Sequence, residues 1–214
     1  MDKLEAFERL FAEYNLHTNL MSKNDIPKIR EKHIPDSLSL KLFFEKYGHD
    51  VKNILDVGTG GGFPSVPLAI KYQNLSVTAL DSIVKKIKFI ELVKSELKLE
   101  NLFPVCSRIE DFEKKEFFDA AVSRAVAPLS SVLEYCAPFV KTNGYIVAYK
   151  AATADEELQN AQNAVKLLKL DFVEKIGYSL SENDSEHCLL IFRKLSATPK
   201  KYPRANNLAR KNPL

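Results

Sequence analysis

The sequence predicts an α/β protein with a mostly parallel, seven-stranded sheet, helices on both faces of that sheet and a helical extension before it. Two observations lead to this prediction. From residue 53 onward, short apolar runs alternate with longer stretches of helical periodicity, which is typical of parallel strands joined by crossover helices. The last two apolar runs, 172–179 and 186–194, are separated only by a polar turn, so they form an antiparallel hairpin at one edge.

Length and composition are those of a single structural domain. The chain has 214 residues and 45% hydrophobic content, which is enough for one α/β unit with a modest extra element. We divide it into a helical extension (1–50), a core (51–195) and a basic tail (196–214). No apolar run approaches the roughly 20 residues that a membrane span requires. The first residues lack the layout of a secretion signal, so we expect a cytoplasmic protein.

The extension is predicted to be helical. Apolar residues recur at helical spacing from about residue 3 to residue 14. Asp25 stands just before an Ile-Pro pair, which predicts the cap and first turn of a second helix. Pro35 disfavours helical geometry at the residue before it, so a third helix is expected to begin with a cap at Asp36 or Ser37.

In the core, each strand is followed by a helix until the hairpin is reached. Because the carboxyl ends of parallel strands meet at one edge of a sheet, the residues that follow the strands are the candidates for a site. The expected strands are 53–56, 76–81, 102–106, 118–123 and 144–150, and the expected helices are 65–72, 83–98, 128–139 and 154–169.

The first strand ends in a turn with four glycines at positions 58, 60, 61 and 62. Glycine adopts positive φ and lets a ligand approach the backbone, so such a turn is typical of a ligand site before a helix. A dinucleotide-binding fingerprint would place its third glycine where Phe63 stands. Gly58, Gly60 and Gly62 instead give G-x-G-x-G, which resembles the first motif of the class I S-adenosylmethionine-dependent methyltransferases. The alternative is a turn that holds no ligand.

Further candidates for that ligand follow the next two strands. Asp81 ends the second strand, where its carboxylate can accept hydrogen bonds from both hydroxyls of a ribose, and Ser82 follows it. The alternative role of Asp81 is to cap the next helix. Residues 108–111, after the third strand, can frame an adenine ring or can be a solvated loop.

Basic residues stand at the ends of the fourth and fifth strands: Arg124 follows the fourth strand and Lys150 ends the fifth. A charged group at the mouth of an apolar strand needs a partner, which for Arg124 is a methionine carboxylate, a nucleic-acid phosphate or a structural ion pair. The following segment lacks the Asn/Asp-Pro-Pro-aromatic loop of amino-directed methyltransferases, and no cysteine stands there to serve a pyrimidine C5 enzyme. An acceptor with a free lone pair, such as guanine N7, needs neither device.

Charge is concentrated at the C-terminus. The net charge is only +3, yet the segment from Arg193 to Leu214 has seven Lys or Arg residues and no acid. This indicates a polyanionic partner, with a solvated tail as the alternative. The three cysteines lie far apart, so we expect neither a disulfide framework nor a metal site.

Several motifs along the whole chain share one resemblance. They are Tyr14-Asn15 with Asn19-Leu20, His33–Ser37, Asp56–Pro64, Ser123–Ala125 and Tyr202–Arg204. Together they resemble the bacterial glucose-inhibited division protein B family, whose members are 16S ribosomal RNA guanine-N7 methyltransferases. Departures from the family pattern are Ser65 and Ala151, where glycine is common, and Asn207–Ala209 in place of Gly-x-Pro.

The resemblance implies S-adenosyl-L-methionine as cofactor and 16S RNA, or the small ribosomal subunit, as partner. We also expect a monomer that does not associate with membranes. With the residues singled out above, the cofactor contacts are Gly58, Gly60, Phe63, Asp81, Ser82, Ile109, Glu110 and Arg124. The residues implied to face RNA or the reacting base are His33, Asp36, Arg124, Lys150, Tyr202 and Arg204. Arg124, Lys150 and His33 are the catalytic candidates, and a structural role for His33 is the alternative. The rival functions are a methyltransferase for a small molecule or protein, and a non-catalytic RNA-binding assembly factor.

Overall fold

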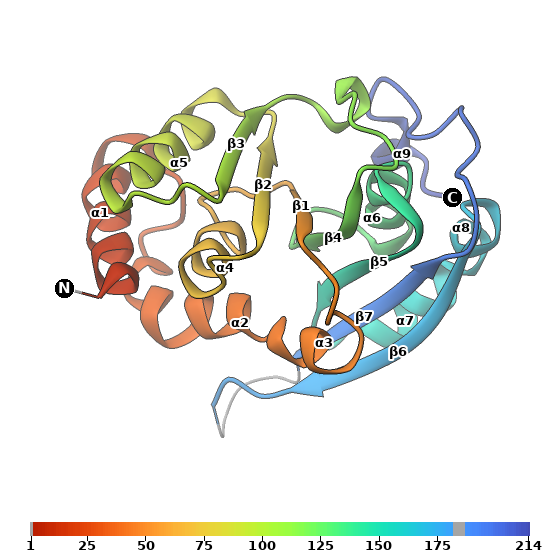
Figure 1. Cartoon of the computed structure of the whole chain (residues 1–214), viewed down its shortest axis with the longest axis horizontal. Coiled ribbons are helices and arrows are strands. Elements are labelled where there is room, and N and C mark those ends of the chain that lie inside the picture. Colours follow the sequence, from red (N-terminus) through yellow and green to blue (C-terminus); the bar gives the residue numbers. More distant parts are fainter. Residues whose placement is uncertain (1, 182–186) are drawn as a thin grey trace.

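The computed structural model describes residues 2–181 and 187–214, and this part of the chain forms one seven-stranded sheet (Figure 1). The strand order is β3-β2-β1-β4-β5-β7-β6. β1 to β5 are mutually parallel, whereas β7 runs antiparallel to β5 and to β6, which confirms the predicted mixed sheet. The strands are β1 Asn53–Val57, β2 Ser76–Asp81, β3 Leu102–Cys106, β4 Phe118–Arg124, β5 Val140–Lys150, β6 Leu170–Tyr178 and β7 His187–Lys194.

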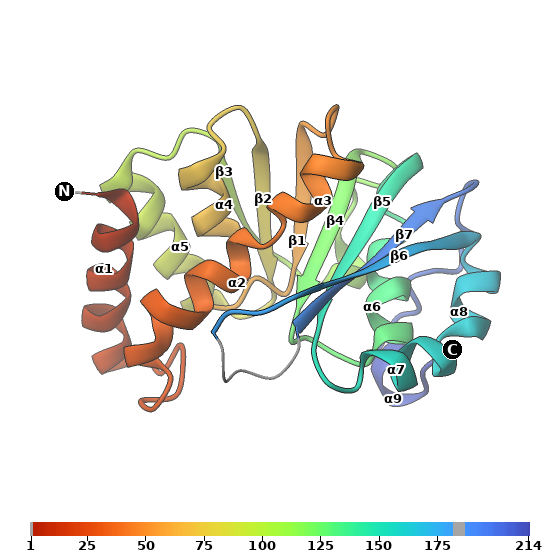
Figure 2. The ribbon, with the colours of Figure 1, turned by 90° about the horizontal axis from the view of Figure 1, so that it is seen from below.

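Helices cover both faces of the sheet (Figure 2). Successive strand residues point to opposite faces, so Ile54 belongs to one apolar core and Leu55 to the other. The helices that pack on the Ile54 face are α1 Lys3–Thr18, α2 Ile34–Leu38, α3 Lys41–Lys46, α4 Ser65–Lys71 and α5 Val84–Leu97. Those associated with the Leu55 face are α6 Leu129–Cys136, α7 Ala154–Asn160, α8 Gln162–Leu167 and α9 Leu208–Lys211. Within the described residues, no helix has the length and apolar character needed to cross a membrane.

The start of α2 differs from its prediction. Ile34 is helical, with φ −70° and ψ −51°, although proline follows it. The reason is the π-helical turn Ile29–His33, which precedes α2 and follows a short 3₁₀ turn at Ile26–Lys28. The N–H of Ile34 donates to the carbonyl of Ile29, five residues earlier, so Pro35 follows a turn that is wider than an α-helical one.

Three predicted helix features are corrected by the structure. Asp25 makes no capping hydrogen bond and instead contacts Ser22 and Lys28. Asp36 lies inside α2 rather than at its start, which frees its carboxylate for the sheet edge. The single helix expected at 154–169 is two helices, because the backbone leaves helical geometry at the fully buried Ala161.

Candidate functional site

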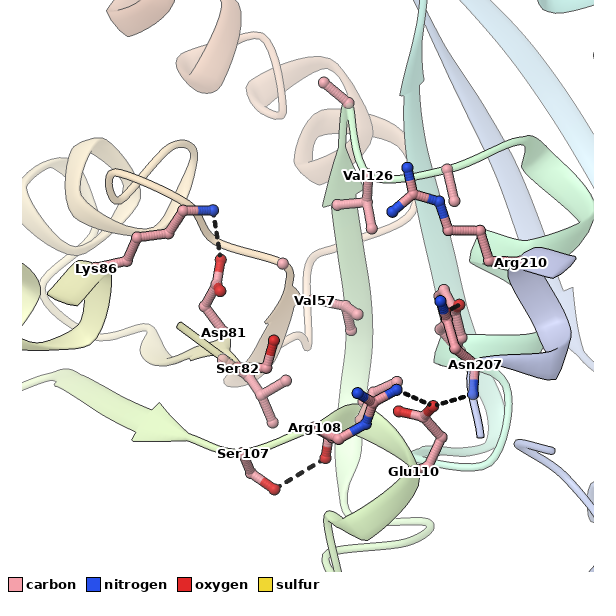
Figure 3. A pocket seen from close by; sticks show the side chains of 16 residues that line it. Val57, Asp81, Ser82, Lys86, Ser107, Arg108, Glu110, Val126, Asn207 and Arg210 are labelled. Atoms are coloured by element: carbon pink, nitrogen blue, oxygen red, sulfur yellow. Dashed lines mark hydrogen bonds and ion pairs between the residues drawn. The ribbon is translucent and has the colours of Figure 1, made fainter. Parts of the chain in front are cut away.

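A cavity of about 360 Å³ opens at the edge where the parallel strands end (Figure 3). Its volume lies in the usual range of small-molecule sites, about 300–1,000 Å³. Residues from β1, β2, the loop after β3, the loop after β4 and the C-terminal tail line it. Five of the predicted cofactor residues meet here, namely Gly58, Asp81, Ser82, Ile109 and Glu110.

The glycine turn is shaped by close packing as well as by backbone geometry. Gly58 has φ +76°, and a Cβ at this position would lie 2.5 Å from Cγ2 of Val126. Glycine is therefore required where the turn passes under the loop that follows β4. Gly60 is absent from the cavity lining, and its N–H donates to Oδ2 of Asp81 at 3.0 Å.

Asp81 connects the glycine turn to α5. Its Oδ2 accepts hydrogen bonds from the Gly60 N–H and from Nζ of Lys86, and its Oδ1 accepts the N–H of Ile83 at 3.0 Å. Asp81 does not cap α5, because the N-cap position is Ile83 and no side chain makes a capping hydrogen bond there. The Asp81 carboxylate instead holds the turn before the helix and lines the cavity. A carboxylate offers about four acceptor positions, so the three bonds leave capacity for a ligand hydroxyl.

Glu110 is an ionised acceptor on the opposite side of the cavity. Its Oε1 accepts hydrogen bonds from Nη2 of Arg108 at 2.9 Å and from the backbone N–H of Asn207 at 3.0 Å. Burial alone would raise the pKa of Glu110, but these hydrogen bonds outweigh it and hold the pKa below its ordinary value. The carboxylate therefore stays charged at neutral pH.

A second cavity, of about 710 Å³, lies beside the first. The two share one wall, Ala125–Ala127, in which Ala125 adopts left-handed geometry with φ 55°. His33, Asp36, Arg124 and Lys150 all line the second cavity, so the structure brings together four of the residues that the resemblance placed toward RNA.

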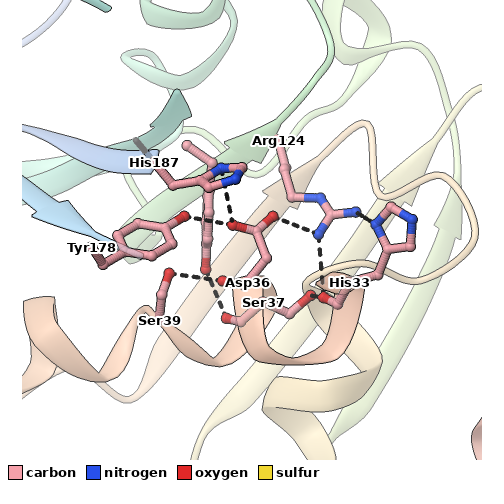
Figure 4. A network of polar contacts seen from close by, with 8 residues as sticks. His33, Asp36, Ser37, Ser39, Arg124, Tyr178 and His187 are labelled. Carbon is pink, nitrogen blue, oxygen red and sulfur yellow. Dashed lines mark hydrogen bonds and ion pairs between the residues drawn. The ribbon is translucent and has the colours of Figure 1, made fainter. Parts of the chain in front are cut away.

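Arg124 lies at the centre of a polar network in the second cavity (Figure 4). Its Nη1 donates to Oδ2 of Asp36 at 2.7 Å and to the His33 carbonyl at 3.2 Å. Oδ1 of Asp36 accepts the hydroxyl of Tyr178 at 2.5 Å. Of the three partners considered for Arg124, the structure shows the ion pair. The guanidinium also lies 5.4 Å from the ring centroid of Phe63, and neither residue lines the first cavity.

His33 is held as a neutral imidazole. Its Nδ1 lies 2.9 Å from Nη2 of Arg124, and arginine only donates, so Nδ1 is the acceptor and the proton is on Nε2. Burial, followed by the charge of Arg124, lowers the pKa of His33 to about 4. The structural role considered for this histidine is therefore present, alongside its position in the second cavity.

Lys150 is bonded inside the protein. Its Nζ donates to the Ala127 carbonyl at 3.0 Å and to Oε2 of Glu157 at 2.6 Å, and the same Oε2 accepts the N–H of Leu129 at 2.7 Å. The pair thus fixes the far end of the wall between the cavities. The sequence gives no sign of this role, because Glu157 is one of three consecutive acids at the start of α7.

The tail is placed differently from its prediction. Tyr202 is 2% exposed and belongs to the core on the Leu55 face, so its ring is not available for stacking on RNA. Arg204 binds the fully buried Glu134 of α6, with Nη2 2.6 Å from Oε2. The structure therefore places the Tyr202 ring in the core and the Arg204 guanidinium in an internal ion pair, and not on a surface that faces RNA. Asn207 and Arg210, which the sequence analysis did not assign to the site, line the first cavity.

Comparison with known proteins gives the family. The family model described as "GidB: rRNA small subunit methyltransferase G" matches residues 1–185. The chain is 38% identical to proteins named ribosomal RNA small subunit methyltransferase G from Lachnoclostridium phytofermentans and from Bacillus pumilus, over all of this chain and 89% and 90% of theirs.

Solved structures show the fold. A putative S-adenosyl-L-methionine-dependent methyltransferase from Methanococcus maripaludis aligns with a TM-score of 0.61 at 14% identity, covering 81% of this chain and 92% of that one. A putative sarcosine dimethylglycine methyltransferase from Galdieria sulphuraria aligns with a TM-score of 0.62 at 14% identity, covering 78% and 88%. The predicted class I methyltransferase fold is confirmed, and the full-length sequence matches show that the chain belongs to the ribosomal RNA small subunit methyltransferase G family.

Proposed function

We propose that this protein transfers the methyl group of S-adenosyl-L-methionine to N7 of a guanine in the 16S RNA of the small ribosomal subunit. The observation that carries the proposal is the pair of cavities that share the wall Ala125–Ala127. Methyl transfer needs a donor and an acceptor whose reacting atoms meet in line. The names of the full-length relatives support ribosomal RNA as the acceptor. We also propose that the protein acts as a monomer in the cytoplasm.

The residues of the first cavity fit the donor. Asp81 has acceptor capacity for ribose hydroxyls, and Val57, Leu80 and Ile109 provide apolar walls for an adenine ring. The charged carboxylate of Glu110 is a suitable acceptor for the exocyclic amine of that ring. When bound, S-adenosyl-L-methionine supplies a methyl group made electrophilic by a sulfonium.

The second cavity suits an acceptor that has no proton to lose. Three of the bases that line it are already engaged: Nδ1 of His33 accepts from Arg124, and the carboxylates of Asp36 and Glu157 accept from Arg124 and Lys150. Guanine N7 attacks through its own lone pair, and the positive charge passes to the purine. Alignment of the base, rather than a general base, would then supply the rate.

The experiment is an in vitro methylation assay with 16S RNA and with intact small subunits from cells that lack this enzyme. Labelled S-adenosyl-L-methionine reports transfer, and chain cleavage at N7-methylguanine maps the nucleotide. We expect transfer to one guanine, and loss of transfer in Asp81→Ala. Binding of S-adenosylhomocysteine without transfer to either RNA substrate would instead indicate an assembly factor. Transfer only to a small metabolite or a protein would indicate the rival enzyme.

A further inference from the structure

The C-terminal segment Tyr202–Asn212 is packed along α6 and reaches the first cavity. Tyr202 and Ala209 are buried in the core on the Leu55 face. Oγ of Ser131 donates to the Ala209 carbonyl at 2.8 Å. The segment is therefore part of the folded unit, although the family match ends at residue 185.

One ion pair anchors this segment. Glu134 is fully buried on α6, and both of its carboxylate oxygens accept hydrogen bonds from the Arg204 side chain, at 2.6 to 3.0 Å. Oε1 of Glu134 also accepts the backbone N–H of Arg204 at 2.8 Å. A buried carboxylate is strongly unfavourable without a partner, so the pair holds the tail against α6.

The anchored tail supplies contacts to the donor cavity. Asn207 has left-handed geometry with φ 58°, its backbone N–H donates to Oε1 of Glu110, and its side-chain Oδ1 accepts the hydroxyl of Tyr135 at 3.2 Å. Figure 3 shows Asn207 and Arg210 across the cavity from Asp81. The tail thus helps to orient Glu110 and forms one side of the cavity.

The charge of the tail does not by itself require an RNA contact at every basic residue. Of the seven basic residues from 193 to 214, Lys194 is fully buried and bonded to Glu116 and to two carbonyls, and Arg204 is paired with Glu134. The excess of positive charge in the sequence is therefore partly an internal feature of the fold.

We propose that Tyr202–Asn212 completes the donor site: Asn207 acts as a positioning residue for Glu110, Arg210 closes the side of the cavity opposite Asp81, and tail docking and binding of the adenosyl ligand stabilise each other. This inference rests on the proposed assignment of the first cavity to the methyl donor. If the two events are linked, each one must favour the other by the same factor.

The test is calorimetric binding of S-adenosylhomocysteine to the full chain. We expect Arg210→Ala to weaken binding about tenfold and Arg204→Lys, which loses the paired contact to Glu134, to weaken it by a similar factor. Lys211→Ala is the matched control, because it removes the same charge from the same short helix at an exposed position outside the cavity lining, and it should bind as wild type. Saturating S-adenosylhomocysteine should also slow tryptic cleavage of the wild-type tail about tenfold, the factor by which the two variants weaken binding.

The outcomes separate this inference from the proposed function. If Asp81→Ala abolishes binding while Arg210→Ala and Arg204→Lys bind as wild type, the tail inference is overturned and the donor site stands. Equal losses in Arg210→Ala and Lys211→Ala would also overturn it, since general charge would explain both. If wild type does not bind S-adenosylhomocysteine, the assignment of the cavity itself is wrong. Should Arg204→Lys fail to fold, as judged by circular dichroism, Arg210→Ala still decides the question.

Discussion

Asp36 and Arg124 lie 88 residues apart in the chain and form an ion pair in which Nη1 of Arg124 is 2.7 Å from Oδ2 of Asp36. Both side chains are nearly buried, at 11% and 13% exposure. The pair joins α2 of the N-terminal extension to the end of β4, where the two cavities meet. The extension therefore forms part of the wall of the second cavity.

Asp36→Asn tests this link. Loss of the charge should loosen Arg124, slow RNA methylation about tenfold or more and lower the free energy of unfolding by about 2 kcal/mol. Affinity for S-adenosylhomocysteine should change little, because neither residue lines the first cavity. Methylation kinetics, calorimetry and urea unfolding measure the three effects. A variant with unchanged methylation but weakened cofactor binding would place the pair on the donor side instead.

Lys150→Met tests the clamp on the shared wall. Removal of the ammonium group frees Glu157 and the Ala127 carbonyl, so we expect kcat/KM for RNA to fall about tenfold. The matched control is Lys141→Met, which breaks the exposed pair with Asp119 and should leave kcat/KM within about twofold. Similar losses in both variants would show that the effect is not specific to the wall.

The lowered pKa of His33 predicts that the folded protein loses stability in acid. Its folded pKa of about 4 lies below the ordinary value of 6.5, so the neutral form favours folding above pH 6.5, and this contribution is lost as the pH falls through about 4. His33→Asn keeps an acceptor for Arg124 and does not titrate. Urea midpoints measured from pH 7 to pH 4 should fall more steeply for wild type than for His33→Asn. Parallel curves would contradict the neutral, buried state of this histidine.

The raised pKa of Asp56 predicts a pH dependence of folding stability with the opposite sign. Burial raises the pKa of this fully buried carboxyl to about 6, despite the hydrogen bond that its Oδ2 accepts from the Ser65 hydroxyl. Its contribution to stability is fully present below pH 3.8 and is lost as the pH rises through about 6. Asp56→Asn should therefore gain stability relative to wild type across this window, by up to about 3 kcal/mol for a shift of roughly two pKa units. If the difference in unfolding free energy between Asp56→Asn and wild type is the same at pH 4 and at pH 8, the carboxyl does not titrate in this range.

Residues at strand ends could be found from the sequence because the topology alone places them. Once alternation of strands and helices indicated a parallel sheet, Gly58, Asp81 and Glu110 had to lie at one edge, and the structure brings them into one cavity. What each residue bonds to could not be predicted. The sequence left three possible partners for Arg124. The ion pair with Asp36 forms because α2, which includes Pro35, places the Asp36 carboxylate beside Arg124.

The tail shows the same limit more strongly. A run of basic residues without acids indicates a polyanionic partner when the rest of the chain is ignored, yet the acid that binds Arg204 lies on α6, 70 residues earlier. Likewise, nothing in the local pattern distinguishes Glu157 from its acidic neighbours. Pairings over such separations depend on packing, which composition and periodicity do not describe.

Ala125 stands between the two cavities with φ 55°, a geometry that costs an alanine about 1 kcal/mol or more. The isolated backbone would not favour this conformation. It is imposed from both ends, by Arg124 fastened to Asp36 on one side and by Lys150 fastened to Glu157 on the other. The wall Ala125–Ala127 between the two cavities therefore owes its conformation to two ion pairs, formed by four side chains, rather than to the preference of its own backbone.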